Sequence, residues 1–128
     1  METIKKKKTT EKLNKLDLTE VIINLIDDKK GGNIVCMDLR KIPEAITDYF
    51  IICDCESTTQ TRAITDYVEY EMAKKYGIKA FHVEGRSFGE WCLIDFGDVV
   101  VHIFQKERRA FYRLEELWHD AVIKEYKI

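Results

Sequence analysis

The sequence predicts a single α/β domain in which a mixed sheet of about five strands packs against two main helices. Two segments carry apolar residues at helical spacing, and five short runs are rich in β-branched and aromatic residues. The helix between the second and third runs suits a parallel crossover, whereas a tight turn joins the last two runs and makes them antiparallel. A chain of 128 residues is long enough to bury such a core within one domain.

The first helix is expected at residues 17 to about 30, where the glycine pair 31–32 ends it. Its apolar stripe consists of Leu18, Val21, Ile22, Leu25 and Ile26. Residues 33–39 then alternate in polarity, which predicts a first strand. After a connection that contains Pro43, the aromatic and β-branched run at residues 49–55 predicts a buried central strand.

The second helix is expected to begin after Ser57, which caps it together with Gln60 in a capping box. Apolar residues continue at helical spacing up to Gly77, whose position is typical of a helix C-terminus. This stripe consists of Ala63, Ile64, Tyr67, Val68, Met72 and Tyr76. A short third strand is expected at about residues 79–83.

The last two strands form a predicted hairpin, residues 91–96 and 99–104, around a turn at Gly97. Side chains alternate between the two faces of a strand. Either placement of the two-residue turn puts the same side chains of the two strands on the same face. One face is purely apolar and is expected to be core: Cys92, Ile94, Phe96, Val99, Val101 and Ile103. The other, the mixed face, combines hydrophobic and ionisable side chains: Trp91, Leu93, Asp95, Asp98, Val100, His102 and Phe104. Its composition indicates a surface that contacts a partner.

The two ends of the chain are expected to lie outside the packed domain, which we place at residues 17–120. Residues 1–16 are predicted to be a flexible basic arm, in which Lys5–Lys8 suit either a contact with RNA or a solvated tail. A helical turn is expected at residues 114–118, because Leu114 and Trp118 have the spacing of one helical face. Residues 121–128 are expected to be a C-terminal tail.

The charge balance argues against a protein whose affinity depends on neutralising many phosphates, because the formal net charge is -2 and the pI is near 5.9. No apolar run approaches the length of a membrane span, and the basic N-terminal segment lacks the apolar core of a secretory signal. We therefore expect a cytoplasmic protein without a membrane partner. In that reducing compartment Cys36, Cys53, Cys55 and Cys92 are expected to be buried free thiols.

Several side chains suggest catalysis or metal binding, and each has a simpler structural explanation. Asp95 and Asp98 flank the Gly97 turn, where aspartate is a common turn residue, although paired carboxylates also suit acid–base or metal chemistry. The cysteines and histidines lack the paired spacing of a zinc site, so no metal is expected. Ser57 is explained as a helix cap rather than a nucleophile. We expect no catalytic residue and no cofactor.

The segment at residues 84–89 contains Gly85 and Gly89, four residues apart, and invites comparison with a phosphate-binding loop. It lacks the Gly-Lys-Ser/Thr ending and a following helix whose N-terminus would receive a phosphate. A flexible loop beside the hairpin, in which Glu84 bonds backbone amides or meets a partner, is the better interpretation.

Four segments, in this order, together resemble the ribosomal silencing factor family, also known as RsfS or Iojap. They are residues 48–53 (DYFIIC), Glu84-Gly85 with Trp91, residues 95–102 (DFGDVVVH), and Arg109 to Tyr112 with Leu114, Glu115, Leu117 and Trp118. The resemblance spans residues 18–121, nearly the whole chain. It implies a nucleotidyltransferase-like topology and a translation repressor that is not an enzyme.

The resemblance also implies a partner and a mechanism. Members of the family bind protein fourteen of the large ribosomal subunit and block joining of the small subunit, which lowers translation when nutrients are short. By resemblance, Trp91 anchors the interface on the mixed face. Tyr112 and Leu114 either extend this surface or belong to a C-terminal turn that packs on the edge of the sheet. Lys5–Lys8 would then make a minor contact with ribosomal RNA. Homodimers occur in the family, so an apolar patch also suits self-association.

The residues also fit other arrangements and functions. From the residues alone, Trp91 packed in the core beside a satisfied His102 is the commoner arrangement. A large-subunit assembly factor is a second alternative, and a phosphotransfer enzyme on a nucleotidyltransferase-like scaffold is a third. Such enzymes resemble one another in a Gly-Ser turn followed by two aspartates two apart, but here residues 54–57 are Asp-Cys-Glu-Ser and no Asp-x-Asp follows on a strand. Silencing factors commonly have glycine at the position of Cys55, so the backbone there is a further point to test.

Overall fold

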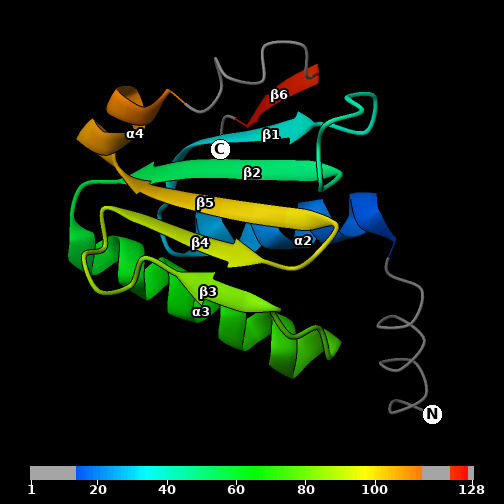
Figure 1. The fold of residues 1–128 in the computed structure, drawn as a ribbon. Helices are drawn as coiled ribbons and strands as arrows, with labels where there is room; N and C mark the ends of the chain where they lie inside the picture. Colours follow the sequence, from blue (N-terminus) through cyan, green and yellow to red (C-terminus); the bar gives the residue numbers. More distant parts are fainter. Residues whose placement is uncertain (1–13, 114–121, 127–128) are drawn as a thin grey trace.

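The computed structural model describes residues 14–113 and 122–126 and confirms the single α/β domain with a mixed sheet (Figure 1). The elements are α2 (Lys15–Asp28), β1 (Gly32–Asp38), β2 (Tyr49–Cys55), α3 (Thr58–Tyr76), β3 (His82–Glu84), β4 (Trp91–Asp95), β5 (Val99–Gln105), α4 (Lys106–Tyr112) and β6 (Val122–Tyr126). The strand order is β3-β4-β5-β2-β1-β6, so the five expected strands lie together and β6 extends the sheet at one edge.

The sheet is mixed because β2 and β5 are parallel neighbours, whereas every other neighbouring pair among the described strands is antiparallel. Helix α3 carries the chain from β2 to β3 at the edge of the sheet, and two further short connections return it through β4 to β5. In the hairpin, Trp91 lies opposite Phe104, Leu93 opposite His102 and Asp95 opposite Val100. The predicted division of the hairpin side chains between the two faces of the sheet is therefore confirmed.

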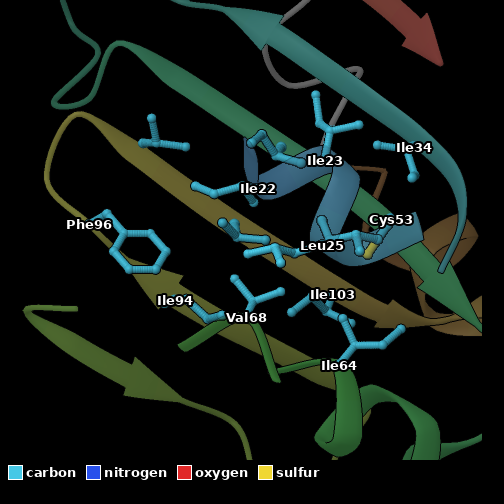
Figure 2. Close-up of a cluster of buried hydrophobic side chains, with 14 of the residues drawn as sticks. Ile22, Ile23, Leu25, Ile34, Cys53, Ile64, Val68, Ile94, Phe96 and Ile103 are labelled. Atoms are coloured by element: carbon cyan, nitrogen blue, oxygen red, sulfur yellow. The ribbon is translucent and has the colours of Figure 1, made fainter. Parts of the chain in front are cut away.

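Helices α2 and α3 pack on one face of the sheet and bury the main hydrophobic core (Figure 1). Figure 2 shows side chains from both helices and from the hairpin in this core, among them Ile22, Leu25, Ile64, Val68, Ile94 and Ile103. The predicted core face of the hairpin is confirmed, since its side chains are at most 7% exposed. Burial of one such side chain contributes about 1.5–3 kcal/mol relative to exposure, which fixes both helices on this side.

A smaller hydrophobic cluster lies on the opposite face of the sheet. It consists of Val35, Met37, Leu39, Ile52 and Phe104, with Ile42, Ala45, Phe50 and Trp91 packed against it. Ile42 and Ala45 belong to the connection between β1 and β2, so this connection covers part of the face that α2 and α3 leave open. The mixed face of the hairpin is therefore continuous with a second, smaller core.

The structure differs from the sequence-based expectation near the C-terminus. Val122–Tyr126, expected within a tail, forms β6 and pairs antiparallel with β1. A short helix that the pattern does not predict, α4, follows β5 directly and contacts β2 and β5. Both elements depend on partners far away in the sequence, which local patterns do not reveal. The expected basic arm up to residue 13 and the helical turn at residues 114–118 lie outside the described residues.

The predicted cap of α3 is confirmed, because the Ser57 hydroxyl oxygen accepts a hydrogen bond from the Gln60 backbone N–H at 3.1 Å. The Gln60 side chain accepts one from the Glu56 backbone N–H at 3.2 Å. Replacing Ser57 with alanine is expected to lower the free energy of unfolding by about 1 kcal/mol, whereas glycine should lower it by only a few tenths. Urea unfolding of both variants measures the difference, and equal stability of Ser57→Ala and the parent protein would contradict the capping role.

Candidate functional site: the mixed face of the hairpin

Trp91 is the largest side chain on the mixed face and remains partly exposed. Its ring stacks on Phe104, the residue directly opposite in the hairpin, with ring centroids 5.0 Å apart and an interplanar angle of 27°. Its indole N–H donates a hydrogen bond to Nδ1 of His102 at 3.0 Å. One stacking contact and one hydrogen bond thus hold the indole in place while part of it stays accessible.

His102 is nearly fully buried, at 4% exposed, and makes a T-shaped contact with the ring of Phe50 at 4.6 Å between centroids. Burial lowers the pKa of His102 to about 3, so the imidazole is neutral at physiological pH. Because Nδ1 accepts the indole hydrogen of Trp91, the single ring proton lies on Nε2. Within the described residues, Nε2 of His102 is the one buried side-chain polar atom without a hydrogen-bond partner.

The predicted residues of the mixed face divide into a floor and a rim. Three residues on β5 are 0–8% exposed and form the floor: Phe104, His102 and Val100. Four residues on β4 and in the turn stay partly or fully exposed and form the rim: Trp91, Leu93, Asp95 and Asp98. The sequence pattern predicts that all seven residues of the mixed face lie at the surface. The difference arises because the second hydrophobic cluster reaches across β5, so the floor residues support the surface from beneath.

Strand β3 extends the mixed face by one strand, which the sequence pattern does not predict. His82 lies opposite Asp95, and Glu84 lies opposite Leu93. The His82 Nε2 atom is 3.0 Å from the Glu84 carboxylate and 3.8 Å from that of Asp95. Asp95 also accepts a hydrogen bond from the Gly97 backbone N–H at 2.7 Å, which confirms it as a turn residue. Only the pairing of β3 with β4 reveals that these groups share a face.

The loop between β3 and β4 is bonded to α3, whereas the sequence pattern predicts a flexible loop. The Arg62 guanidinium donates hydrogen bonds to the backbone carbonyls of Arg86 at 2.7 Å and Ser87 at 3.0 Å. In the opposite direction, the Arg86 guanidinium bonds to the carboxylates of Asp66 and Glu69 on α3. These contacts tie the segment that precedes β4 to a long helix, so they also hold the start of β4.

Gly85 allows this loop to approach β4 closely. Its φ is +90°, and a Cβ atom at this position would lie 2.0 Å from the carbonyl oxygen of Trp91. Gly89 has a φ of +73°, and a Cβ atom there would lie 2.9 Å from the Thr58 backbone carbonyl oxygen. Side chains do not fit such places without displacing the backbone. The two glycines therefore serve packing of the loop, which agrees with the weak sequence signal for phosphate binding.

Comparison with known proteins decides the family. The family model described as "Ribosomal silencing factor during starvation" matches residues 11–128 of the chain. The chain belongs to the ribosomal silencing factor family. The silencing factor RsfS of Halalkalibacterium halodurans is 41% identical over 105 residues, which is 82% of this chain and 88% of that protein. RsfS of Bacillus subtilis is 37% identical over 109 residues, or 85% and 91% of the two chains.

Solved structures similar to this silencing factor domain share its fold. A crystal structure from Chromobacterium violaceum has a TM-score of 0.78 at 30% identity, over 83% of this chain and 87% of that chain. One from Bacillus halodurans has a TM-score of 0.72 at 35% identity, over 88% and 99%. Silencing factors are ribosome-binding regulators rather than known enzymes, so membership implies association with the ribosome. Among the described residues, no helix is both long enough and apolar enough to span a bilayer.

Asp54, the first residue of the segment compared above with the Gly-Ser turn of nucleotidyltransferases, has a structural role in this silencing factor domain. Asp54 accepts hydrogen bonds from the Asn33 side-chain amide at 3.1 and 3.2 Å and from the Arg109 guanidinium at 3.1 Å. Both members of the Asp54–Arg109 ion pair are largely buried, and the pair links α4 to β2. Within residues 14–113, and in the described part of the C-terminus, no group of three or more His, Cys, Asp or Glu side chains is arranged to hold a metal ion.

Cys55, where silencing factors commonly have glycine, has ordinary strand geometry. It lies in β2 opposite Gln105 of β5 and is not among the residues with positive φ, so no glycine is required there. All four cysteines are free and buried, as predicted. Burial raises the pKa of Cys55 to about 12 and raises that of Cys53 well above its usual value. Protonated, buried thiols of this kind pack as small hydrophobes and are chemically inert.

Proposed function

We propose that this protein binds the large ribosomal subunit through its protein fourteen and blocks joining of the small subunit, which lowers translation when nutrients are short. Family membership supports the ribosomal target. The observation that carries the proposed site is the partly exposed Trp91, held on the sheet face that α2 and α3 leave open. Tryptophan is among the residues most enriched in interface hot spots.

The accessible part of the mixed face suits a protein partner with an apolar centre and a basic rim. Trp91 and Leu93 supply apolar area on β4, while Glu84, Asp95 and Asp98 place carboxylates around it. Lysine or arginine side chains of the partner would meet these carboxylates, which chiefly raises the association rate and the specificity. Repression then needs no chemistry, because the bound factor occupies space that the small subunit requires.

Other contacts expected from the sequence belong to the same proposal. Tyr112 is the last residue of α4, and its side chain, like Leu114, lies outside the part of the structure that is described. We propose that both extend the docking surface beyond Trp91. Lys5–Lys8 would add a minor contact with ribosomal RNA, and a second copy of the chain is the alternative occupant of the apolar patch.

A subunit-joining assay tests the mechanism. Purified small and large ribosomal subunits are mixed with and without the protein and are separated on a sucrose gradient. We expect excess protein to move the subunits from the joined fraction to the free fractions and to sediment with the large subunit in the absence of nucleotide. Normal joining by large subunits that carry the protein would contradict repression and leave only attachment.

A role in large-subunit assembly is the second candidate, because the name of one relative states it. The mouse protein "Mitochondrial assembly of ribosomal large subunit protein 1" is 30% identical over 102 residues, which is 77% of this chain and 44% of that protein. Incomplete large subunits in cells that lack the protein would favour assembly. Normal subunits in those cells, together with inhibited joining of mature subunits, would favour silencing.

A further inference from the structure

His102 is an unusual residue for its place in the fold. It is the one polar side chain in the apolar stretch of β5 between Val99 and Phe104. Its Nε2–H group is buried without a hydrogen-bond partner, and an unpaired buried donor destabilises the folded state. Valine or isoleucine, which fill the neighbouring positions, would avoid this cost. The cost indicates that the imidazole provides something that an apolar side chain cannot.

What the imidazole provides is an acceptor for Trp91. The indole N–H is a donor only, and it meets the lone pair of His102 Nδ1 at 3.0 Å. The two residues are diagonal neighbours in the hairpin, because Trp91 lies opposite Phe104 and His102 lies opposite Leu93. Stacking on Phe104 sets the plane of the indole but does not by itself select one orientation within that plane. The hydrogen bond to His102 selects it.

We propose that His102 is a positioning residue of the docking surface, which holds the partly exposed indole of Trp91 in the orientation that the partner meets. This inference rests on the proposed function, because it assigns a role within the same surface. A side chain that is ordered before binding loses less freedom when the complex forms. Release of the indole from His102 is therefore expected to weaken binding about two- to tenfold.

The protonation state of His102 agrees with this role. Burial lowers the pKa of His102 to about 3, so Nδ1 keeps its lone pair at the pH at which the protein works. A protonated ring would instead direct an N–H at the indole N–H and break the contact. His102 thus serves as a permanent acceptor and not as a switch in the physiological pH range.

Two substitutions of His102 distinguish the effect of its hydrogen-bond acceptor from the effect of its ring shape. His102→Phe keeps a ring but removes the acceptor, whereas His102→Asn removes the ring but places an amide oxygen near the position of Nδ1. Ile103→Val, fully buried on the opposite face of the same strand, is the control for a small loss of core packing. All variants are made with Trp118→Phe, so that Trp91 is the single tryptophan of a chain that has two.

The orientation of the indole is measured in the free protein by exchange of its N–H hydrogen in NMR and by decay of its fluorescence anisotropy. Binding is measured with purified bacterial large ribosomal subunits. We expect His102→Phe to show faster exchange, faster depolarisation and about two- to tenfold weaker binding. His102→Asn should retain much of the protection, and Ile103→Val should match the parent protein. His102→Leu serves the same comparison if circular dichroism shows that the phenylalanine variant does not fold.

The outcomes separate this inference from the function on which it rests. Unchanged exchange and anisotropy in the variants without an acceptor would overturn the positioning role, as would a loosened indole with unchanged affinity. Failure of the parent protein to bind large subunits would instead overturn the proposed function, and the docking role of His102 with it. The exchange data distinguish these cases, because they need no partner.

Discussion

Replacement of Trp91 by alanine is expected to weaken binding to large-subunit protein fourteen by about thirtyfold or more, which corresponds to about 2 kcal/mol. The substitution removes the largest accessible side chain of the mixed face and the stacking contact with Phe104. It also leaves Nδ1 of His102 without its donor. Isothermal titration of the variant against the purified ribosomal protein measures the loss.

Tyr70→Ala is the matched control for this experiment. Tyr70 is an aromatic residue that is even more accessible, at 58% exposed, but it belongs to α3 on the opposite side of the sheet. We expect Tyr70→Ala to bind as the parent protein does, and circular dichroism checks that both variants are folded. Unchanged affinity of Trp91→Ala would remove Trp91 from the site, and an equal loss in both variants would show that the effect is not local.

The faces of the hairpin are predictable from the sequence because strand geometry is local. Side chains alternate with a period of two, and a short turn at Gly97 fixes how the two strands face each other. This reasoning places Trp91, Leu93 and His102 on one face and the core residues on the other, as the structure has them. The ends of α3 are predictable for the same reason, since Ser57 and Gly77 act within one turn of the helix.

Burial on the mixed face is not predictable in this way, because it depends on what packs above the sheet. Ile42 and Ala45 come from a connection without a strong pattern, and they reach the cluster that buries Phe104. Helix α4 has no side-chain cap at its start, but the contact of Arg109 with Asp54, which is 55 residues away, ties it to β2. Strand β6 likewise depends on its antiparallel pairing with β1, which is distant in the sequence.

The sequence also does not reveal that the loop before β4 is held in place, because its contacts are with residues of α3 that are distant in the chain. Its glycines suggest flexibility, but Arg62 and Arg86 form hydrogen bonds between the loop and α3 in both directions. Ion pairs of arginine on an exposed surface usually contribute little to the free energy of unfolding. Here the bonds of Arg62 end on backbone carbonyls, so they set the path of the chain, while Arg86 pairs its charge with carboxylates on α3. Trp91, the proposed anchor, therefore begins a strand whose preceding loop is already held by α3.

The folded protein is expected to lose stability as the pH falls below about 6.5, and His102 alone should account for about 2 kcal/mol at pH 5. Burial lowers the pKa of His102 to about 3 in the folded state, whereas an unfolded histidine titrates near pH 6.5. Between these values the unfolded chain binds a proton that the folded state excludes. The free energy of unfolding then falls by about 1.4 kcal/mol for each pH unit, and the contribution is fully present only above pH 6.5.

Urea unfolding at several values between about pH 7.5 and 5 measures this loss, with His102→Asn as the matched control that cannot titrate at this position. Hydrogen bonds from Arg40 hold the pKa of Asp38 below its usual value, so the stability that Asp38 contributes is lost only at lower pH than this window. The parent protein should therefore show the steeper decline. Parallel curves for the two proteins would mean that the folded state accepts the proton as readily as the unfolded chain does, and Nδ1 of His102 would then not be a permanent acceptor for Trp91.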